Sequence, residues 1–274
     1  MPSIFRPVPR PVSTFSVGAV IGALGGLVGL SGAEFRLPFL TGTFRYNPVE
    51  AAILNKALSF LVIAVALPFR SETVPLAAIW DHWPLVAALL AGSLAGAWSG
   101  GKWAKRLKSR PLSMVIASLL LLTAIMLAFG HGAKLGQAIV IAPEDLVADV
   151  PVQLIAGVIA GLLVGLIASV LSVAGGELLI PTLMLLFGAD IKLAGSLTLA
   201  ISLPTMLAGL PRYFRDKSWP SLKRNLFFLL IAGAGTLAGT YFGGRLLGHV
   251  SEAILIPALA FMLSLSAIKV WQNG

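Results

Sequence analysis

The sequence predicts an all-α polytopic membrane protein made of two inverted repeats, each a broken-helix hairpin followed by three transmembrane helices. Its 274 residues are 57% hydrophobic and only 11% charged, whereas a typical soluble domain carries about 25% charged residues. Apolar runs of membrane-spanning length recur along the chain. A glycine-rich motif with a glutamate occurs twice, 143 residues apart, and such a fixed interval indicates an internal duplication.

The repeated motif occupies residues 31–40 and 174–183. The shared positions are Gly32/Gly175, Glu34/Glu177, Pro38/Pro181 and Leu40/Leu183. A second pair of segments, 92–102 and 235–245, matches at the same interval with six of eleven residues identical. Because separate anchors share one offset, we expect the duplication to cover the whole chain.

The duplication divides the chain into four parts: a juxtamembrane tail (1–14), repeat 1 (15–130), an acidic linker (131–150) and repeat 2 (151–274). Each repeat opens with an apolar segment, a glycine-rich break and a short apolar stretch. The stretch 34–44 has eleven residues, which at about 1.5 Å per residue is too short to cross a core of about 30 Å. We therefore predict a half-helix there. The remaining predicted segments are 15–30, 49–69, 84–101, 112–130, 152–171, 177–188, 193–210, 225–247 and 253–271.

The N-terminal region resembles a cleavable signal peptide, with basic residues, an apolar run and small residues after it. The same small-residue break recurs at 174–176, deep inside the chain, where no signal peptidase acts. We therefore interpret the N-terminal break as part of the architecture.

Two topologies compete for each repeat. If residues 15–44 cross the membrane once, ten lysines and arginines lie inside and eight outside. If this stretch and 152–188 each enter and return as a hairpin, fourteen lie inside and four outside. The positive-inside rule favours the hairpins. This topology makes the repeats inverted and places both termini in the cytoplasm.

Composition also bears on function. The net charge is +9, and most of the charged residues lie in loops between apolar runs. This placement is typical of residues that set membrane topology and attract anionic lipid, and it argues against nucleic-acid binding. The chain has no cysteine, and its three histidines are scattered, so we expect no metal site and no cofactor. No phosphate-binding loop or hydrolytic grouping is present, and we expect no enzymatic activity.

The two breaks predict the binding site. Inverted repeats with broken helices bind substrate near the midplane, where backbone N–H groups at half-helix starts favour an anion. The first copy offers Ser31, Gly32, Glu34, Arg36, Asn55 and Lys56. The second copy offers Ser172, Gly175, Gly176, Glu177, Ser196 and Thr198.

The charged members of this set have alternative explanations. A glutamate beside an anion would repel it, so each carboxylate either caps a helix start or carries a coupled proton. Arg36 is a counter-ion for the anion in the first copy only, because Leu179 replaces it in the second. Lys56 binds substrate or snorkels to the interface, and the hydroxyls bind substrate or join helices.

The chain resembles the TauE/SafE family of sulfite exporters at both breaks. The resemblance rests on 29–34 with Pro38, on 172–177 with Pro181, and on the Ala-Gly-Ser-Leu-Thr-Leu segment 194–199. In the first copy Ser31 and Ala33 replace glycines of the family pattern. The resemblance implies export of sulfite or small organosulfonates across the bacterial inner membrane.

We therefore predict a secondary transporter that exports sulfite, sulfoacetate or related organosulfonates. Its expected partners are the small anionic substrate and membrane lipid. A homodimer is the oligomeric state that we consider. One alternative is a cation or metal permease that uses Glu34 and Glu177 as ligands. A second is a membrane subunit of a larger complex whose basic loops dock a partner.

Overall fold

The computed structural model describes residues 11–103, 109–132, 150–171, 176–215 and 218–273. Within these ranges the chain is helical and contains no strand. It divides into two compact units, and each is described by itself. Unit 1 comprises Met1–Pro75 and Ser202–His249, and unit 2 comprises Leu76–Ile201 and Val250–Gly274. The prediction of an all-α polytopic membrane protein is confirmed.

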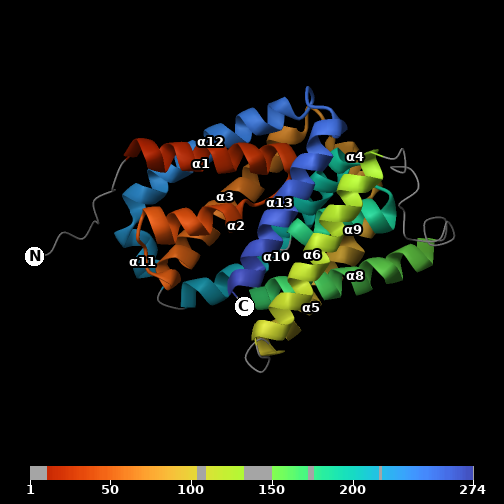
Figure 1. The fold of residues 1–274 in the computed structure, drawn as a ribbon, viewed down its shortest axis with the longest axis horizontal. Helices are drawn as coiled ribbons and strands as arrows, with labels where there is room; N and C mark the ends of the chain where they lie inside the picture. The colour runs from red at the N-terminus through yellow and green to blue at the C-terminus, as the bar shows by residue number, and fades with distance from the viewer. Residues whose placement is uncertain (1–10, 104–108, 133–149, 172–175, 216–217, 274) are drawn as a thin grey trace, which may run out of the picture. The chain divides into compact units, whose positions relative to one another are not determined.

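The helices follow one another as labelled in Figure 1. In chain order they are α1 (Pro11–Val28), α2 (Ala33–Pro38), the π-helical turn η1 (Phe39–Thr43), α3 (Pro48–Arg70), α4 (Leu76–Asp81), α5 (Trp83–Trp103), α6 (Ser109–Gly132), α8 (Val150–Leu171), α9 (Gly176–Phe187), α10 (Ile191–Arg215), α11 (Ser218–Arg224), α12 (Leu226–Leu246) and α13 (Glu252–Asn273). Six of the described helices are long and apolar enough to cross a membrane: α1, α3, α5, α8, α10 and α12.

Most predicted segments match these helices within a few residues, with three differences. α1 begins at Pro11, inside the predicted tail. The predicted half-helix 34–44 is a short α-helix that continues as η1 after Pro38, because proline has no N–H to continue the α-helical hydrogen bonds. The short helices α4 and α11 were not predicted. Most of the predicted linker, 133–149, lies outside the described residues.

The helix bounds repeat at the interval that the motifs show. Both bounds of α12 lie 143 residues after those of α5. The starts of α9, α10 and α13 lie 143 residues after those of α2, α3 and α6. This regularity agrees with the predicted duplication, and the inversion of the two repeats stays a prediction.

In unit 1, α1 and α12 pack side by side with their backbones in close contact (Figure 1). A Cβ atom on Gly18 would overlap the carbonyl oxygen of Ala232, and one on Gly26 would overlap that of Thr240. Because the residue numbers rise together along both helices, α1 and α12 run parallel. Small residues allow such close approach in lipid. The glycines of this contact are Gly18, Gly22, Gly26, Gly235, Gly239 and Gly243.

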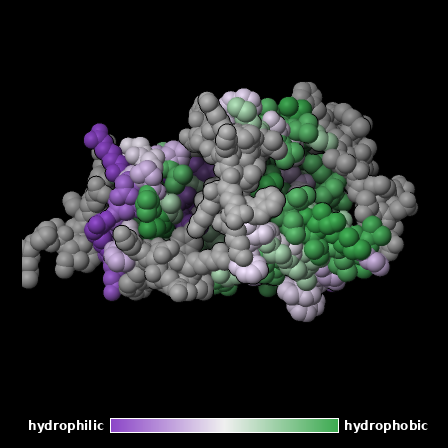
Figure 2. Space-filling view, turned by 90° about the horizontal axis from the view of Figure 1, so that it is seen from below, coloured by the Kyte–Doolittle hydropathy of each residue, from purple (hydrophilic) through white to green (hydrophobic). Residues whose placement is uncertain are grey.

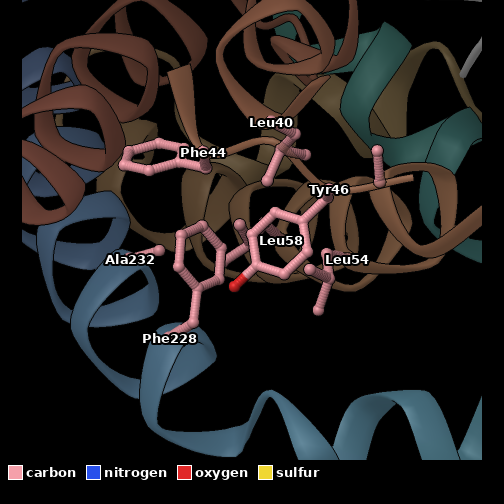
Figure 3. Packing of buried hydrophobic residues seen from close by; sticks show 8 residues of the cluster. Leu40, Phe44, Tyr46, Leu54, Leu58, Phe228 and Ala232 are labelled. Carbon is pink, nitrogen blue, oxygen red and sulfur yellow. The ribbon is translucent and has the colours of Figure 1, made fainter. Parts of the chain in front are cut away.

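After α1 the chain turns back, so that it reaches the start of α12 again. Gly26, near the end of α1, lies against Thr240 and Gly244 in the last turns of α12. Phe44, after η1, lies edge-on to Phe228 at the start of α12, with 5.3 Å between ring centroids. Figure 3 shows Phe44, Tyr46 and Phe228 facing one another in a buried cluster. Residues 11–46 therefore run along α12 and come back, as the hairpin prediction requires.

Two ion pairs connect α3 with the two ends of α12. Glu50, in the first turn of α3, pairs with Arg224, directly before α12. Glu72, two residues beyond the end of α3, pairs with Arg245 in the last turn of α12 at 2.9 Å. Since starts and ends are both joined, α3 and α12 run parallel. The hairpin topology requires this shared direction, whereas a single crossing by residues 15–44 would make the two helices antiparallel.

In unit 2, α5 and α8 pack in a similar way. A Cβ on Gly92 would overlap the carbonyl oxygen of Val158, and one on Gly96 would overlap that of Leu162, so these helices are also parallel. α13 packs along α6, and α9 contacts α8. The glycines of the α5–α8 contact are Gly92, Gly96, Gly161 and Gly165.

The surface carries large apolar areas. Figure 2 shows a broad hydrophobic area on one face. Strongly exposed apolar side chains lie on the long helices, among them Leu230, Phe242, Ile254 and Phe261. Such an exposed apolar surface suits contact with lipid chains, in agreement with a multi-pass membrane protein.

We expect Gly239→Ala to destabilise unit 1 by about 1–3 kcal/mol, because the added methyl group would overlap the carbonyl oxygen of Ala19. The melting temperature of purified protein should fall by about 3–10 °C. Gly42→Ala is the matched control, since nothing lies within 4 Å of its Cβ position, and its melting temperature should not fall. Equal melting temperatures for the two variants would contradict the close α1–α12 packing.

Single cysteines can test the direction of α3 and α12, because the chain has no native cysteine. Val49→Cys and Lys223→Cys lie at the starts of the two helices, whereas Glu72→Cys and Gly248→Cys lie beyond their ends; all four positions are exposed. A membrane-impermeant maleimide should label the first pair from the cytoplasmic side and the second pair from the opposite side. Labelling of Val49→Cys and Lys223→Cys from opposite sides would contradict the hairpin topology.

Candidate functional site

The candidate site of unit 1 centres on Arg36, whose side chain is only 2% exposed. Its Nη1 group donates to the backbone oxygen and the Oδ1 of Asn55, both at 3.3 Å, and to Ser59 Oγ at 3.2 Å. Asn55 and Ser59 lie four residues apart in α3, which places them on one helix face. Three acceptors therefore fix one end of the guanidinium.

The other edge of this guanidinium is open. Among the described residues, Nε and Nη2 of Arg36 have no hydrogen-bond partner although both atoms are buried. A buried donor without a partner costs about 1–3 kcal/mol, and more when it is charged. Such a cost is uncommon in a folded protein unless a ligand or water satisfies the group.

The break between α1 and α2 is bound tightly to its surroundings. Gly32 has a φ of 66°, a left-handed value that favours glycine, and a Cβ there would overlap Ile21. Ser31 Oγ accepts from the N–H of Ala33 at 3.4 Å. Asn55 Nδ2 donates to the Ala33 oxygen at 2.8 Å. Asn55 therefore supports both the break and Arg36.

A second buried arginine supports the end of α1. Arg70, fully buried, donates from Nη1 to the carbonyl oxygens of Gly26 and Leu27, each at 2.9 Å. These carbonyls belong to the last turn of the helix, which lacks internal partners and carries the negative end of the dipole. Arg70 thus stabilises the end of α1, the predicted first arm of the hairpin.

Two further candidates of the first copy lie nearby. Glu34 is in the first turn of α2, two residues before Arg36, and its carboxylate interacts electrostatically with the guanidinium. Lys56 follows Asn55 in α3 and is half-buried. One residue along a helix turns the side chain by about 100°, so Lys56 lies beside the face that carries Asn55 and Ser59, and Ser59 is its i+3 neighbour on the helix surface.

The candidate site of unit 2 has different chemistry. α9 begins at Gly176, and Glu177 follows in its first turn, 7% exposed. Glu177 Oε1 accepts a hydrogen bond from Ser266 Oγ of α13 at 2.8 Å. Leu179, the counterpart of Arg36, is buried. This candidate site therefore contains a carboxylate with a hydroxyl donor, and its α9 has no cation where α2 has Arg36.

The remaining candidates of the second copy lie on α10 or at the break. Ser196 and Thr198 are buried. Ser196 Oγ donates to the Lys192 oxygen of its own helix at 3.1 Å, and Thr198 Oγ1 has no hydrogen-bond partner among the described residues. Ser172 and Gly175 lie outside the described residues.

The structure thus brings Ser31, Gly32, Glu34, Arg36 and Asn55 together around one break. Their role in binding stays a prediction, as does that of the candidates in unit 2. Sequence reasoning left out of the candidate set Ser59, Ser266 and Arg70, which contact the two breaks or their charged residues. One signal was available for Ser266: a hydroxyl residue also occurs 143 positions earlier, at Thr123.

The donors around Arg36 suit an anion rather than a metal ion. A guanidinium binds oxyanions through N–H donors and offers no acceptor to a cation. Among the described residues, no group of three or more histidines, cysteines or carboxylates is placed to hold a metal.

Comparison with known proteins gives one match. The sequence model of the family described as Sulfite exporter TauE/SafE matches residues 14–270, nearly the whole chain. Searches of curated proteins and of solved structures found no match.

We expect Ser266→Ala to lower the free energy of unfolding by about 1–3 kcal/mol, because the buried Glu177 carboxylate loses a hydrogen-bond donor. Ser264→Ala is the matched control, since Ser264 donates only to Ala260 of its own helix. Thermal unfolding of both purified variants would measure the difference. A Ser264→Ala variant as unstable as Ser266→Ala would show that the contact with Glu177 contributes nothing.

Proposed function

This chain belongs to the TauE/SafE family of sulfite exporters, and from that premise we propose that it is a secondary transporter of small sulfur-containing anions. The substrates are sulfite, sulfoacetate or related organosulfonates. Transport leads out of the cell across the bacterial inner membrane, and both termini lie in the cytoplasm. The described helices and the family give a multi-pass membrane protein; substrate, direction and orientation are part of the proposal.

The observation that carries the proposal is the buried, half-open guanidinium of Arg36. A cation within a membrane segment costs at least about 2.5–3.5 kcal/mol, and such residues mark substrate pathways in membrane proteins. If Arg36 served only to hold α2 against α3, the acceptors that Asn55 and Ser59 provide would be sufficient. The open Nε and Nη2 donors have the chemistry that an anionic substrate requires.

The glutamates fit this proposal better than the alternative of a cation permease. Glu34 interacts electrostatically with Arg36, so the arginine offsets the negative charge that would attract a cation. Glu177 takes a hydrogen bond from Ser266. No specific observation supports a membrane subunit of a larger complex.

We expect Arg36→Gln to reduce sulfite transport in proteoliposomes by about 10- to 100-fold, because a charge-assisted pair of hydrogen bonds is worth about 1.5–3 kcal/mol. Arg245→Gln is the matched control. This variant carries the same substitution at an arginine in an exposed ion pair. It should transport sulfite at the wild-type rate. Thermal unfolding of both variants would show whether Arg36→Gln remains folded. A folded Arg36→Gln variant with wild-type transport would refute the role of Arg36.

A further inference from the structure

The open edge of Arg36 has a defined shape. Nη1 is occupied by Asn55 and Ser59, which leaves Nε and Nη2. The N–H groups of these two atoms point in parallel along one side of the planar guanidinium, so that they match two oxygens of one oxyanion head. A sulfite or sulfonate head has such a pair of oxygens on a single sulfur.

The charge around this edge is small. Arg36 supplies one positive charge, its partners Asn55 and Ser59 are neutral, and the carboxylate of Glu34 offsets part of that charge. α2 packs mainly against α1, η1 and α3, and neither α1 nor η1 has an ionisable side chain.

The ionisable residues at the two ends of α3 have other neighbours. Glu50 pairs with Arg224, and Arg70 donates to the end of α1. Lys56 lies about 100° from Asn55 but only about 60° from Ser59 around the axis of α3, so its charge is counted at this edge. Within unit 1, Arg36 and Lys56 are positive and Glu34 is negative, so the net charge that this edge offers to an anion is at most one positive unit.

A single positive charge selects between anions of different charge. In a buried site the interaction between charges is strong, and an uncompensated charge is costly to remove from water. A head with one negative charge is neutralised at this edge. A head with two negative charges would leave one buried without a partner, next to the carboxylate of Glu34.

We propose that Arg36 binds a singly charged oxyanion head through two of its oxygens. Sulfite is then carried as its singly protonated form, and organosulfonates are carried through the sulfonate group. The doubly charged forms of sulfite, sulfate and thiosulfate are rejected. This inference rests on the proposed function and specifies the charge state of its substrate.

Substrate counterflow in proteoliposomes tests the inference without any mutation. Sulfite passes from its singly to its doubly charged form near neutral pH, whereas methanesulfonate keeps one charge throughout. Both are measured well below saturation, with equal pH on the two sides, from about pH 6 to about pH 9. The ratio of sulfite to methanesulfonate counterflow removes any effect of pH on the protein itself. We expect this ratio to fall by up to about tenfold per pH unit at the alkaline end, because the protonated fraction of sulfite falls in that proportion.

The outcomes separate the two levels of the proposal. A ratio that falls with pH, together with competition by methanesulfonate but not by sulfate or thiosulfate, supports the inference. A ratio that is constant or rises, or equal competition by sulfate, overturns the inference and leaves sulfur-anion transport intact. Absence of counterflow with sulfite and with methanesulfonate overturns the proposed function and the inference with it.

A pair of conservative variants tests the two-oxygen contact. Arg36→Lys keeps the positive charge but loses the parallel donors, so the concentration for half-maximal methanesulfonate counterflow should rise about tenfold or more. Arg245→Lys, at the exposed ion pair with Glu72, should leave this half-maximal concentration unchanged. A folded Arg36→Lys variant with wild-type half-saturation would overturn the two-oxygen contact.

Discussion

The constraint on which unit 1 depends is that the backbone interrupted between α1 and α2 must find its hydrogen-bond partners inside the protein. Each unsatisfied group costs several kcal/mol where no water is present. α3 supplies these partners: Arg70 binds two carbonyls at the end of α1, and Asn55 binds the Ala33 carbonyl at the start of α2. The polar residues of this apolar helix are therefore explained first by the break beside it.

The candidate site follows from the same contacts. Asn55, which supports the break through its amide nitrogen, uses its oxygen atoms to hold Arg36. The position of the cation is thus coupled to the geometry of the break. At the position 143 residues later, Leu179 stands in place of Arg36, and Glu177 accepts a hydrogen bond from Ser266. The two copies of the motif, which we predict to be related by duplication, therefore lie in two different chemical environments.

Local features of the sequence were sufficient to predict most of the fold. Apolar length defined the long helices, and the Gly-x-Glu pattern located the break between α1 and α2; the second predicted break, 172–175, lies outside the described residues. The short helices α4 and α11 were missed because six or seven residues carry no clear periodicity. The partnerships of Arg70 and Ser266 were missed for another reason: they join residues 44 and 89 positions apart, and only the packing of whole helices decides which polar groups meet.

The direction of the helices connects the charge pattern of the sequence with the packing. Loop charges favour a hairpin, and the packing of unit 1 independently makes α3 parallel to α12. Neighbouring parallel helices place like ends of their dipoles together, which is unfavourable. The glycines between α1 and α12 offset this by allowing close backbone contact. The arginines at the ends of α12 pair with Glu50 and Glu72, so that the charges flanking the helix also fix its alignment with α3.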